Sequence, residues 1–296
     1  MIIVRLSGGM GNQMFQYAIG RALSLKHNVP LKLDTMFLEH RIKIPYFLRP
    51  GFTFRNFDLD VFNIKAEIAK LSDISFWNRP FLGGKLMLVI DAILRKLAFL
   101  PGWEKRFSFD KKVLDLGPNT YLQGFWQSKK YFLDVAQIIR QDFTLKEPLP
   151  LITRELLHDI QNTESLCVHL RRTHGGGKFH GEYNMDYYEK GIKYIESRKK
   201  IEKIFVFSDD VDWCEKNIKF NYPTIFIGRE YAGLKNEGDL FLMSACKYFI
   251  IPNSTFSWWG AWLSTNPDKI VVAPQQWFAD SSIDTNDLIP KEWIRI

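Results

Sequence analysis

The second half of the chain repeats short, largely apolar runs that are separated by stretches with helical periodicity. Runs of four or five residues without polar alternation are typical of strands buried on both faces, as in a parallel sheet covered by helices. The runs span residues 166–170, 204–207, 224–227, 248–251 and 269–272. The pattern predicts an α/β fold with a parallel sheet in this half of the chain.

The first half opens with a strand, a glycine-rich turn and a helix. Residues 2–6 are apolar, glycines interrupt the run, and residues 12–26 have helical periodicity before a second strand at 31–34. Residues 35–120 are irregular, and residues 121–143 predict a short strand that leads into an amphipathic helix. The sequence KEPLP at 146–150 is typical of a linker.

We therefore expect two Rossmann-like α/β domains, an N-terminal one at 1–150 and a C-terminal one at 151–296. Two such domains would face each other across a cleft, with ligands at the carboxyl ends of the strands. A chain of 296 residues with 46% hydrophobic residues has enough apolar material for both cores.

Charge and cysteine content restrict the partners. The net charge of +7 suits an anionic partner, but the chain has no arginine-rich run, zinc-ligand spacing or RNP-like motif. A phosphate-bearing small molecule is favoured over nucleic acid. Three widely spaced cysteines and no signal-like N-terminus predict a reducing compartment, the cytoplasm.

Residues 81–100 are apolar throughout except for Lys85, Asp91, Arg95 and Lys96. At about 100° per residue these charges share one side of a helix, which predicts an amphipathic helix rather than a membrane span. Packing on the core is favoured, and peripheral contact with the cytoplasmic face of the inner membrane is the alternative.

The glycine loop comprises Gly9, Met10, Gly11 and Asn12, preceded by Gly8. Its spacing is neither GxGxxG nor a P-loop, so a dinucleotide-dependent oxidoreductase is disfavoured. Backbone N–H groups of such a loop, with Asn12 and Gln13 as further donors, can bind an anion. A tight structural turn is the alternative.

Three polar groups follow predicted strands, where an α/β sheet holds its ligands. The first is His169 with Arg171 and Arg172, in which one guanidinium can reach a diphosphate while the other braces the site.

The second group is Ser208, Asp209 and Asp210, whose carboxylates suit a ribose, a sugar or a helix N-cap. No metal ion is predicted at this position, because the acidic spacing also suits a first helical turn.

The third group opens a helix, where hydroxyls and free N–H groups form a cradle for a pyrophosphate. It consists of Asn253, Ser254, Thr255, Phe256 and Ser257. Trp258, Trp259 and Trp262 follow, and packing between layers is favoured for them over stacking on a sugar or base.

Taken together, seven segments in order resemble the motifs of bacterial-type α-1,2-fucosyltransferases. They are SGGMGNQMFQYAIGRAL at 7–23, FDLDVFNI at 57–64, YLQGFWQSKKYF at 121–132, CVHLRR at 167–172, MDYYEKGIKYI at 185–195, FSDD at 207–210 and NSTFSWWGAWL at 253–263. The resemblance covers most of the chain.

This resemblance implies a GT-B architecture, in which the N-terminal domain at 1–150 is on the acceptor side and the C-terminal domain at 151–296 binds GDP-fucose. The implied reaction is metal-independent, inverting transfer of fucose from GDP-β-L-fucose to the 2-hydroxyl of a terminal galactose. The family's HxRRxD element implies that Arg172 and Arg171 contact the diphosphate of GDP, with His169 near the nucleotide. It also implies that Asp239 recognises guanine and that Ser254 and Thr255 hold the phosphates. No cofactor beyond the donor is implied, and the product is GDP.

The chain departs from HxRRxD at its last position, where His174 replaces the aspartate. His174, His180, Glu182 and Asp186 are candidate general bases for the acceptor hydroxyl. Alternatively, the departing phosphate takes the proton and no side chain acts as base.

The sequence leaves other functions open as well: a fucosyltransferase of another linkage, such as α-1,6, and a sugar-binding module without catalysis. It does not identify the natural acceptor glycan or the oligomeric state.

Overall fold

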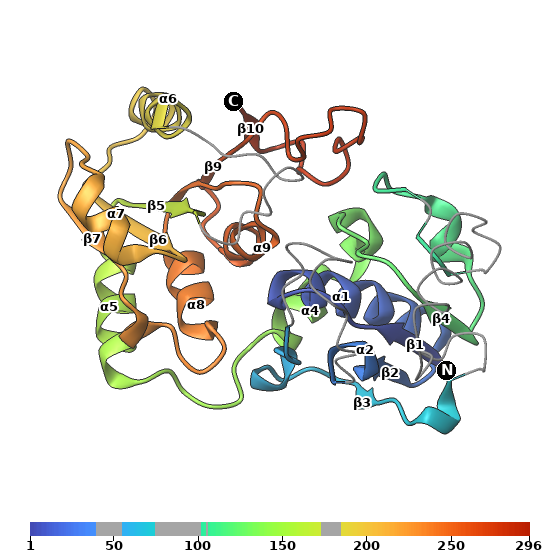
Figure 1. Cartoon of the computed structure of the whole chain (residues 1–296). Coiled ribbons are helices and arrows are strands. Elements are labelled where there is room, and N and C mark those ends of the chain that lie inside the picture. The colour runs from blue at the N-terminus through green and yellow to red at the C-terminus, as the bar shows by residue number, and fades with distance from the viewer. Residues whose placement is uncertain (40–54, 75–101, 105, 173–184) are drawn as a thin grey trace, which may run out of the picture. The chain divides into compact units, whose positions relative to one another are not determined.

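The computed structural model describes residues 1–39, 55–74, 102–104, 106–172 and 185–296, which form two compact units (Figure 1). Unit 1 contains Met1–Thr144 and Asn286–Leu288, and unit 2 contains Leu145–Thr285 and Ile289–Ile296. The division after Thr144 lies six residues before the boundary that the sequence predicts at residue 150. The short return of 286–288 to unit 1 has no counterpart in that prediction.

Unit 1 is built on a four-stranded parallel sheet of order β3-β2-β1-β4. Its strands are β1 (Ile2–Arg5), β2 (Leu31–Asp34), β3 (Glu67–Ile68) and β4 (Thr120–Leu122). Its helices are α1 (Met10–His27), α2 (Met36–Glu39) and α4 (Ala136–Asp142). The opening strand, glycine turn, helix and second strand that the sequence predicts are confirmed, although α1 begins two residues earlier than predicted.

Helix α1 packs closely on one face of this sheet. A Cβ atom on Gly20 would lie 2.4 Å from Cγ2 of Val4 and 2.8 Å from Cδ1 of Leu31, so only glycine lets the helix approach this far. Asn28 ends α1 in the left-handed conformation that commonly terminates helices. The opposite face of the sheet buries Ile3 and Tyr121.

A buried carboxylate joins the two ends of unit 1's sequence. Asp142, 4% exposed at the end of α4, accepts hydrogen bonds from the Tyr17 hydroxyl at 2.6 Å and from Nε of Arg21 at 2.9 Å. The Tyr17 hydroxyl accepts in turn from the backbone N–H of Lys65 at 3.0 Å. Burial raises the pKa of Tyr17, so this hydroxyl stays a donor.

Unit 2 is built on a six-stranded, wholly parallel sheet of order β10-β9-β8-β5-β6-β7. Its strands are β5 (Ser165–Leu170), β6 (Lys203–Ser208), β7 (Thr224–Phe226), β8 (Tyr248–Ile250), β9 (Ile270–Ala273) and β10 (Ile294–Arg295). The five strands predicted from apolar runs are confirmed to within one residue at each end, and β10 was not predicted.

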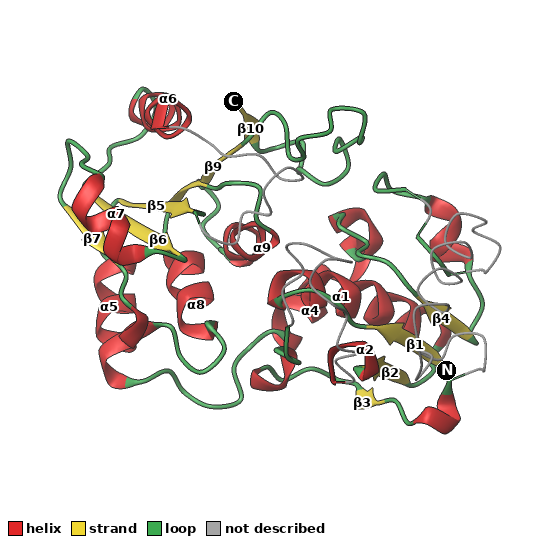
Figure 2. Ribbon diagram, in the orientation of Figure 1, coloured by secondary structure: helices red, strands yellow, loops and turns green. Residues whose placement is uncertain are grey.

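Helices cover both faces of the unit 2 sheet (Figure 2). They are α5 (Leu151–Gln161), α6 (Met185–Glu196), α7 (Val211–Asn217), α8 (Glu237–Ala245) and α9 (Thr255–Leu263). Side chains of α6 and α7 pack against Leu166, Val168 and Leu170 in one apolar cluster. Because side chains alternate along a strand, Cys167 and His169 of β5 face the other layer, on the side of α5 and α8.

The strand order of unit 2 fixes where its chain directions diverge. From β5 the chain proceeds to β6 and β7 on one side, and from β8 it proceeds to β9 and β10 on the other. The loops that follow β5 and β8 therefore leave the sheet in opposite directions and open a crevice at their carboxyl ends.

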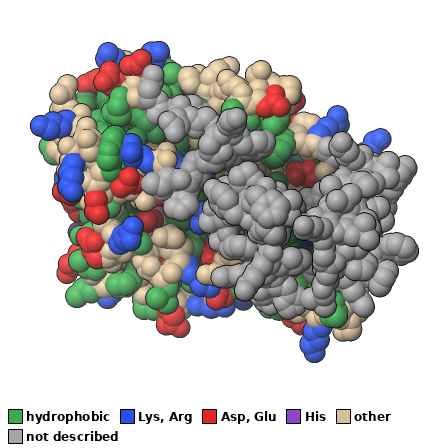
Figure 3. All heavy atoms as spheres, in the orientation of Figure 1, with side chains coloured by type: hydrophobic (Ala, Val, Ile, Leu, Met, Phe, Trp, Pro, Cys, Tyr) green, Lys and Arg blue, Asp and Glu red, His purple; other side chains and the backbone are tan. Residues whose placement is uncertain are grey.

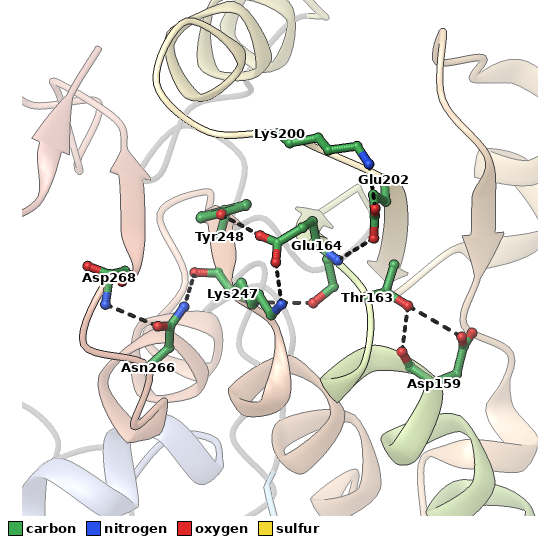
Figure 4. A network of polar contacts seen from close by, with 10 residues as sticks. Asp159, Thr163, Glu164, Lys200, Glu202, Lys247, Tyr248, Asn266 and Asp268 are labelled. Carbon is green, nitrogen blue, oxygen red and sulfur yellow. Dashed lines mark hydrogen bonds and ion pairs between the residues drawn. The ribbon is translucent and has the colours of Figure 1, made fainter.

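The amino ends of β5 and β8 are joined by a polar network (Figure 4). The Glu164 carboxylate accepts from Nζ of Lys247 and, at 2.7 Å, from the Tyr248 hydroxyl. The backbone N–H of Glu164 donates to the Glu202 carboxylate at 3.0 Å. Lys247, followed by Tyr248, holds the pKa of Glu164 below its usual range, so Glu164 is ionised near neutral pH and these contacts link the starts of the two strands.

On the face shown in Figure 3, basic and acidic side chains of the described residues are interspersed. Within the described ranges, no helix combines the length and the hydropathy that crossing a membrane requires. The amphipathic helix predicted at 81–100 lies outside those ranges.

Replacing Asp142 with alanine is expected to lower the free energy of unfolding of unit 1 by about 3 kcal/mol, because it leaves the buried Tyr17 hydroxyl and Arg21 without their acceptor. Asp115→Ala is the matched control, since the Lys26–Asp115 pair has side chains 49% and 69% exposed. It should cost less than about 1 kcal/mol. Urea denaturation measures both, and equal losses would contradict the role given to Asp142.

Candidate functional site

His169 lies next to the carboxyl end of β5 and is almost fully buried. Its Nδ1 has no hydrogen-bond partner among the described residues. Burial, helped by the positive charge of Arg171, lowers the pKa of His169 to about 4. The imidazole is therefore neutral at physiological pH and offers one donor and one acceptor.

The two arginines that follow β5 have different surroundings. Nη1 of Arg171 donates to the backbone carbonyl of Asn253 at 3.3 Å, across the β5/β8 divergence. Arg172 turns to the other side: its Nε lies 3.3 Å from Oδ2 of Asp210. Its guanidinium carbon is 3.2 Å from the centre of the Trp213 ring, a cation–π contact. The two arginines thus contact different loops, Arg171 the loop after β8 and Arg172 the loop after β6.

Arg172 is hydrogen-bonded to the loop after β6. Oδ1 of Asp209 accepts from the backbone N–H of Arg172 at 2.7 Å. The Ser208 hydroxyl accepts from the backbone N–H of Asp210 at 3.0 Å. Asp210 occupies the N-cap position of α7, but its side chain makes no capping hydrogen bond. N-capping, the common role for such a carboxylate, is wrong for Asp210, whose carboxylate pairs with Arg172 instead.

The loop after β8 leads directly into α9. Asn253 and Ser254 are buried, and Nδ2 of Asn253 donates to the Trp277 carbonyl at 3.1 Å. Ser254 is the N-cap of α9, yet its hydroxyl makes no capping bond. Thr255 and Phe256 are partly buried in the first turn, and Ser257 is buried there. The first backbone N–H groups of a helix have no intrahelical acceptor, so this turn points donors toward the Arg171 side.

The tryptophans of α9 are core residues. Trp258 and Trp259 have no exposed surface and Trp262 is 7% exposed. The rings of Trp258 and Trp259 meet edge to face with centres 5.2 Å apart. The predicted packing between layers is confirmed.

Asp239 lies in the first turn of α8, after Asn236 in the left-handed conformation. Its Oδ1 is buried and has no hydrogen-bond partner among the described residues. Burial, and then the negative charge of Glu237, raises the pKa of Asp239 to about 7. A carboxylate oxygen that is buried without a donor has a free-energy cost that a ligand supplying N–H groups would remove.

The glycine loop belongs to unit 1, whereas the groups described above belong to unit 2. Gly9 is the N-cap of α1, Met10 and Gly11 are buried in its first turn, and Gly9 borders the Arg55 side chain. Oδ1 of Asn12 accepts from Nε2 of Gln127 at 2.9 Å. Anion binding by this loop stays a prediction.

Gln13 differs from its predicted role as an extra donor for an anion. Its Nε2 donates to the carbonyls of Gly8 at 2.9 Å and of Asn56 at 2.8 Å. Its Oε1 accepts from the backbone N–H of Asp58 at 2.9 Å. The amide of this fully buried residue is used up in holding residues 56–58, so it is structural.

Of the candidate bases, Asp186 lies in the first turn of α6. His174, His180 and Glu182 lie outside the described residues. Two contributors were missed by the sequence interpretation, Trp213 and the Asn253 carbonyl. Only the position of Trp213 in the turn after Asp209 and Asp210 could have suggested the first, and a backbone carbonyl leaves no sequence signal.

Comparison with known proteins gives the chain relatives over its whole length. Residues 102–296 match the model of Glycosyl transferase family 11. An alpha-1,2-colitosyltransferase of Escherichia coli is 35% identical over 307 residues, which cover 100% of this chain and 99% of that protein. The galactoside alpha-(1,2)-fucosyltransferase 1 of Aotus azarae is 25% identical over 175 residues, 52% of this chain and 46% of that protein.

Among solved structures, the fucosyltransferase NodZ from Bradyrhizobium matches with a TM-score of 0.51 and 15% identity. The match covers 88% of this chain and 91% of that one. At this identity the likeness concerns the fold, and it confirms the predicted GT-B-like α/β class with a parallel sheet in each unit.

The neutral state of His169 can be checked by NMR. We expect its ring resonances, assigned with His169→Gln, to stay constant from pH 8 to about pH 5, because its pKa lies near 4. Since the folded pKa is below the unfolded value of 6.5, the unfolded state binds more protons between these values. The contribution to stability is full above pH 6.5 and is lost toward pH 4. A ring that titrates near pH 6.5 in the folded protein would contradict this.

Proposed function

The chain belongs to glycosyl transferase family 11, and we propose that it transfers L-fucose from GDP-β-L-fucose to the 2-hydroxyl of a terminal galactose. Two relatives have names that specify an α-1,2 linkage. The one that covers the whole chain is named for colitose, and the one that covers about half of it is named for fucose on a galactoside. We propose inversion at the anomeric carbon, no metal ion and no resident cofactor, with GDP as the product.

The observation that carries the proposal is the contact of Arg171 with the Asn253 carbonyl at the β5/β8 divergence. Doubly wound sheets bind nucleotides where their strand order reverses. Here a guanidinium and the first turn of α9 lie at that place, and both stabilise the charge of a diphosphate. Arginine and helix dipole then supply the positive charge that other enzymes take from a metal ion.

The contacts support different tasks for the two arginines. Sequence resemblance ranked Arg172 first, but its guanidinium is engaged by Asp210 and Trp213. Arg171 lies on the side of α9, and we assign it the principal contact with the diphosphate. Arg172 fixes the loop after β6 and orients the neighbouring backbone, and its own reach to the phosphates stays a prediction.

Asp239 is assigned to guanine. Guanine presents N1–H and N2–H as adjacent donors, and a carboxylate accepts both at once. The buried, unpartnered Oδ1 of Asp239 supports this assignment. His169, with a neutral ring and a free Nδ1, is assigned a place beside the nucleotide. Ser208, Asp209 and Asn253 to Ser257 complete the proposed donor site.

The reaction is an in-line displacement. The bond from the fucosyl anomeric carbon to the diphosphate oxygen breaks with its electron pair, while the acceptor 2-oxygen attacks the opposite face. The diphosphate gathers negative charge, which Arg171 and the α9 N–H groups stabilise in the transition state. The proton of the 2-hydroxyl passes to a general base or to the departing phosphate, and Asp186, His174, His180 and Glu182 stay candidates.

Colitose is the second candidate for the transferred sugar, because the 35% identical relative that spans the whole chain is named for it. Colitose is L-fucose without its 3-hydroxyl. A site that hydrogen-bonds a hydroxyl rejects the analogue lacking it far more strongly than a pocket rejects an extra hydroxyl. We therefore expect a clear preference between GDP-fucose and GDP-colitose rather than equal use.

The function is tested by incubating the protein with GDP-fucose, GDP-colitose and a panel of galactosides, and by determining the product linkage by NMR. Product with fucose at the galactose 2-position supports the proposal. Exclusive use of GDP-colitose would show that the proposed donor is wrong, and a 6-linked product would show that the proposed linkage is wrong. GDP binding without transfer to any acceptor would favour a sugar-binding module.

Arg171→Ala should lower kcat by about 100- to 1,000-fold, because it removes a preorganised contact to the leaving group worth about 2.7 to 4 kcal/mol. Arg198→Ala is the control, since this exposed guanidinium stacks on Tyr194 and bonds only within its own turn among the described residues. It should keep wild-type turnover. An Arg171→Ala enzyme within threefold of wild type would refute the assignment.

The affinity for GDP should fall as the pH drops through about 7, because the ionised Asp239 binds guanine and its free pKa is raised to about 7. Asp239→Asn should bind GDP about 10- to 100-fold more weakly and lose this dependence. The terminal phosphate of GDP titrates in the same pH range, so calorimetric titrations with GDP are needed for both proteins. The phosphate contributes equally to both, and the difference between their pH profiles belongs to Asp239.

Glu237→Gln is the matched control for Asp239. It should keep the dependence with a lower midpoint, because one negative charge beside Asp239 is gone. Identical pH profiles in wild type and Asp239→Asn would remove guanine recognition from Asp239.

A further inference from the structure

Unit 1 has a strand-order reversal of its own. Its order β3-β2-β1-β4 sends the chain from β1 to β2 and β3 on one side and places β4 on the other. The loops after β1 and after β4 therefore meet at the carboxyl edge of the sheet, where α/β units bind ligands. The donor site proposed above uses the corresponding place in unit 2 and leaves this one without an assigned role.

Two side chains of α1 tie these loops together. The buried Gln16 amide donates to the Gly124 carbonyl at 2.8 Å and accepts from the backbone N–H of Ser7 at 3.0 Å. Asn12 accepts from Gln127 at 2.9 Å. Gln16 thus contacts both loops, and Asn12 adds a second bond from α1 to the loop after β4, so the edge is preorganised before any ligand arrives.

Three buried polar atoms after β4 have no partner among the described residues. Nε2 of Gln123 lies directly after the strand, and the other two are Nε1 of Trp126 and Oε1 of Gln127, in residues that are 1% and 6% exposed. Of the latter two, one is a donor and one an acceptor. Buried polar atoms are nearly always hydrogen-bonded in folded proteins, so two orphans in adjacent residues call for a ligand or water.

Trp126 also has a backbone φ of 55°, in the left-handed region. A bulky residue rarely adopts this conformation, and where it persists the surrounding contacts impose it. The contacts that impose it are the hydrogen bonds from the backbone N–H groups of Phe125 and Trp126 to the Glu104 carboxylate. The loop is thus held in a disfavoured shape that presents the indole at the edge of the sheet.

The Glu104 carboxylate completes the cluster. It accepts from the backbone N–H groups of Phe125 at 2.7 Å and of Trp126 at 2.9 Å. A Cβ atom placed on Gly124 would lie 2.8 Å from Oε2 of Glu104 and 3.0 Å from Cε2 of Trp126, the atom bonded to Nε1. Gly124 therefore lets the carboxylate and the indole N–H approach the same point. Burial raises the pKa of Glu104 to about 7.

The chemistry of this cluster suits a neutral, hydroxyl-bearing ligand. An indole N–H, an amide oxygen and a carboxylate offer one donor and two acceptors, the mixture that sugar hydroxyls satisfy because each both donates and accepts. None of the three groups is cationic, and Glu104 repels a phosphate.

We propose that Glu104, Trp126 and Gln127 bind the acceptor sugar at the β1/β4 divergence of unit 1. This inference rests on the proposed glycosyl transfer. It gives the family-matched segment after β4 a role in acceptor recognition, and it gives Asn12 a positioning role through Gln127 in place of the donor contact predicted from sequence.

The test is steady-state kinetics of the full chain with two variants. Trp126→Phe removes the indole N–H together with part of the ring, and Gln127→Met keeps the side-chain length but removes Oε1 and the Nε2 that donates to Asn12. We expect the KM for the galactoside to rise about five- to tenfold in each variant, the usual loss for one hydrogen bond. The KM for the nucleotide sugar and the affinity for GDP should stay within twofold of wild type.

Trp103→Phe is the matched control. Trp103 pairs with Gln123 beside β4 and its Nε1 is also unpartnered among the described residues. Because it directly precedes Glu104 in an extended segment, its side chain points to the opposite face. This variant should leave the KM for the galactoside unchanged.

The outcomes separate the inference from the proposed function. If the wild-type protein transfers sugar but Trp126→Phe and Gln127→Met keep the galactoside KM within twofold, or if the donor KM rises instead, the inference is overturned. A wild-type protein that transfers nothing to any acceptor overturns the proposed function instead.

Should either variant fail to fold, hydrogen exchange of the wild type decides the same question. The galactoside should slow exchange of the amides of Phe125 and Trp126 and leave those at the start of α9 unchanged. The reverse pattern would overturn the proposed acceptor site.

Discussion

The structure of unit 2 depends on one topological constraint, the divergence of the chain after β5 and β8. All six strands run parallel, so their carboxyl ends share one edge, and only between β5 and β8 do the following loops leave in opposite directions. This geometry brings residues more than eighty positions apart into contact, as the Arg171 to Asn253 hydrogen bond shows. The polar network around Glu164 holds the same two strands together at the opposite edge.

Burial determines the electrostatic state of the groups at this edge. Burial keeps His169 neutral at physiological pH, and burial followed by the charge of Glu237 raises the pKa of Asp239 to about 7, so Asp239 is part protonated there. Such groups cost the free protein stability, and a ligand that satisfies them returns it as binding free energy. Arg172 is different, since Asp210 and Trp213 already stabilise its charge. Arg171 lies at the β5/β8 divergence, where it contacts the loop that leads into α9, and it therefore has the principal role in the proposed site.

Sequence was a reliable guide wherever a single physical signal dominated. The apolar runs of unit 2 predicted its strands because a strand buried on both faces consists mostly of apolar side chains, although β5 also buries His169. Arg171 and Asn253 were placed at a common edge because the carboxyl ends of parallel strands share one edge. The sequence did not predict which partner each polar side chain contacts. Nothing in the sequence shows that Gln13 spends its amide on residues 56–58, or that Asp210 pairs with Arg172 rather than capping α7. Glu104 is a further case, because its partners are backbone N–H groups.

The two units share a plan, a parallel sheet with a strand-order reversal, but they differ in the chemistry placed there. A guanidinium and a helix N-terminus lie at the edge of unit 2, and a carboxylate with an indole and an amide lies at that of unit 1. The central claim is that the diphosphate binds between β5 and β8. A crystal structure with GDP tests it most directly: the account predicts the diphosphate against Arg171 and the first turn of α9, and a diphosphate bound at the glycine loop of unit 1 would contradict it.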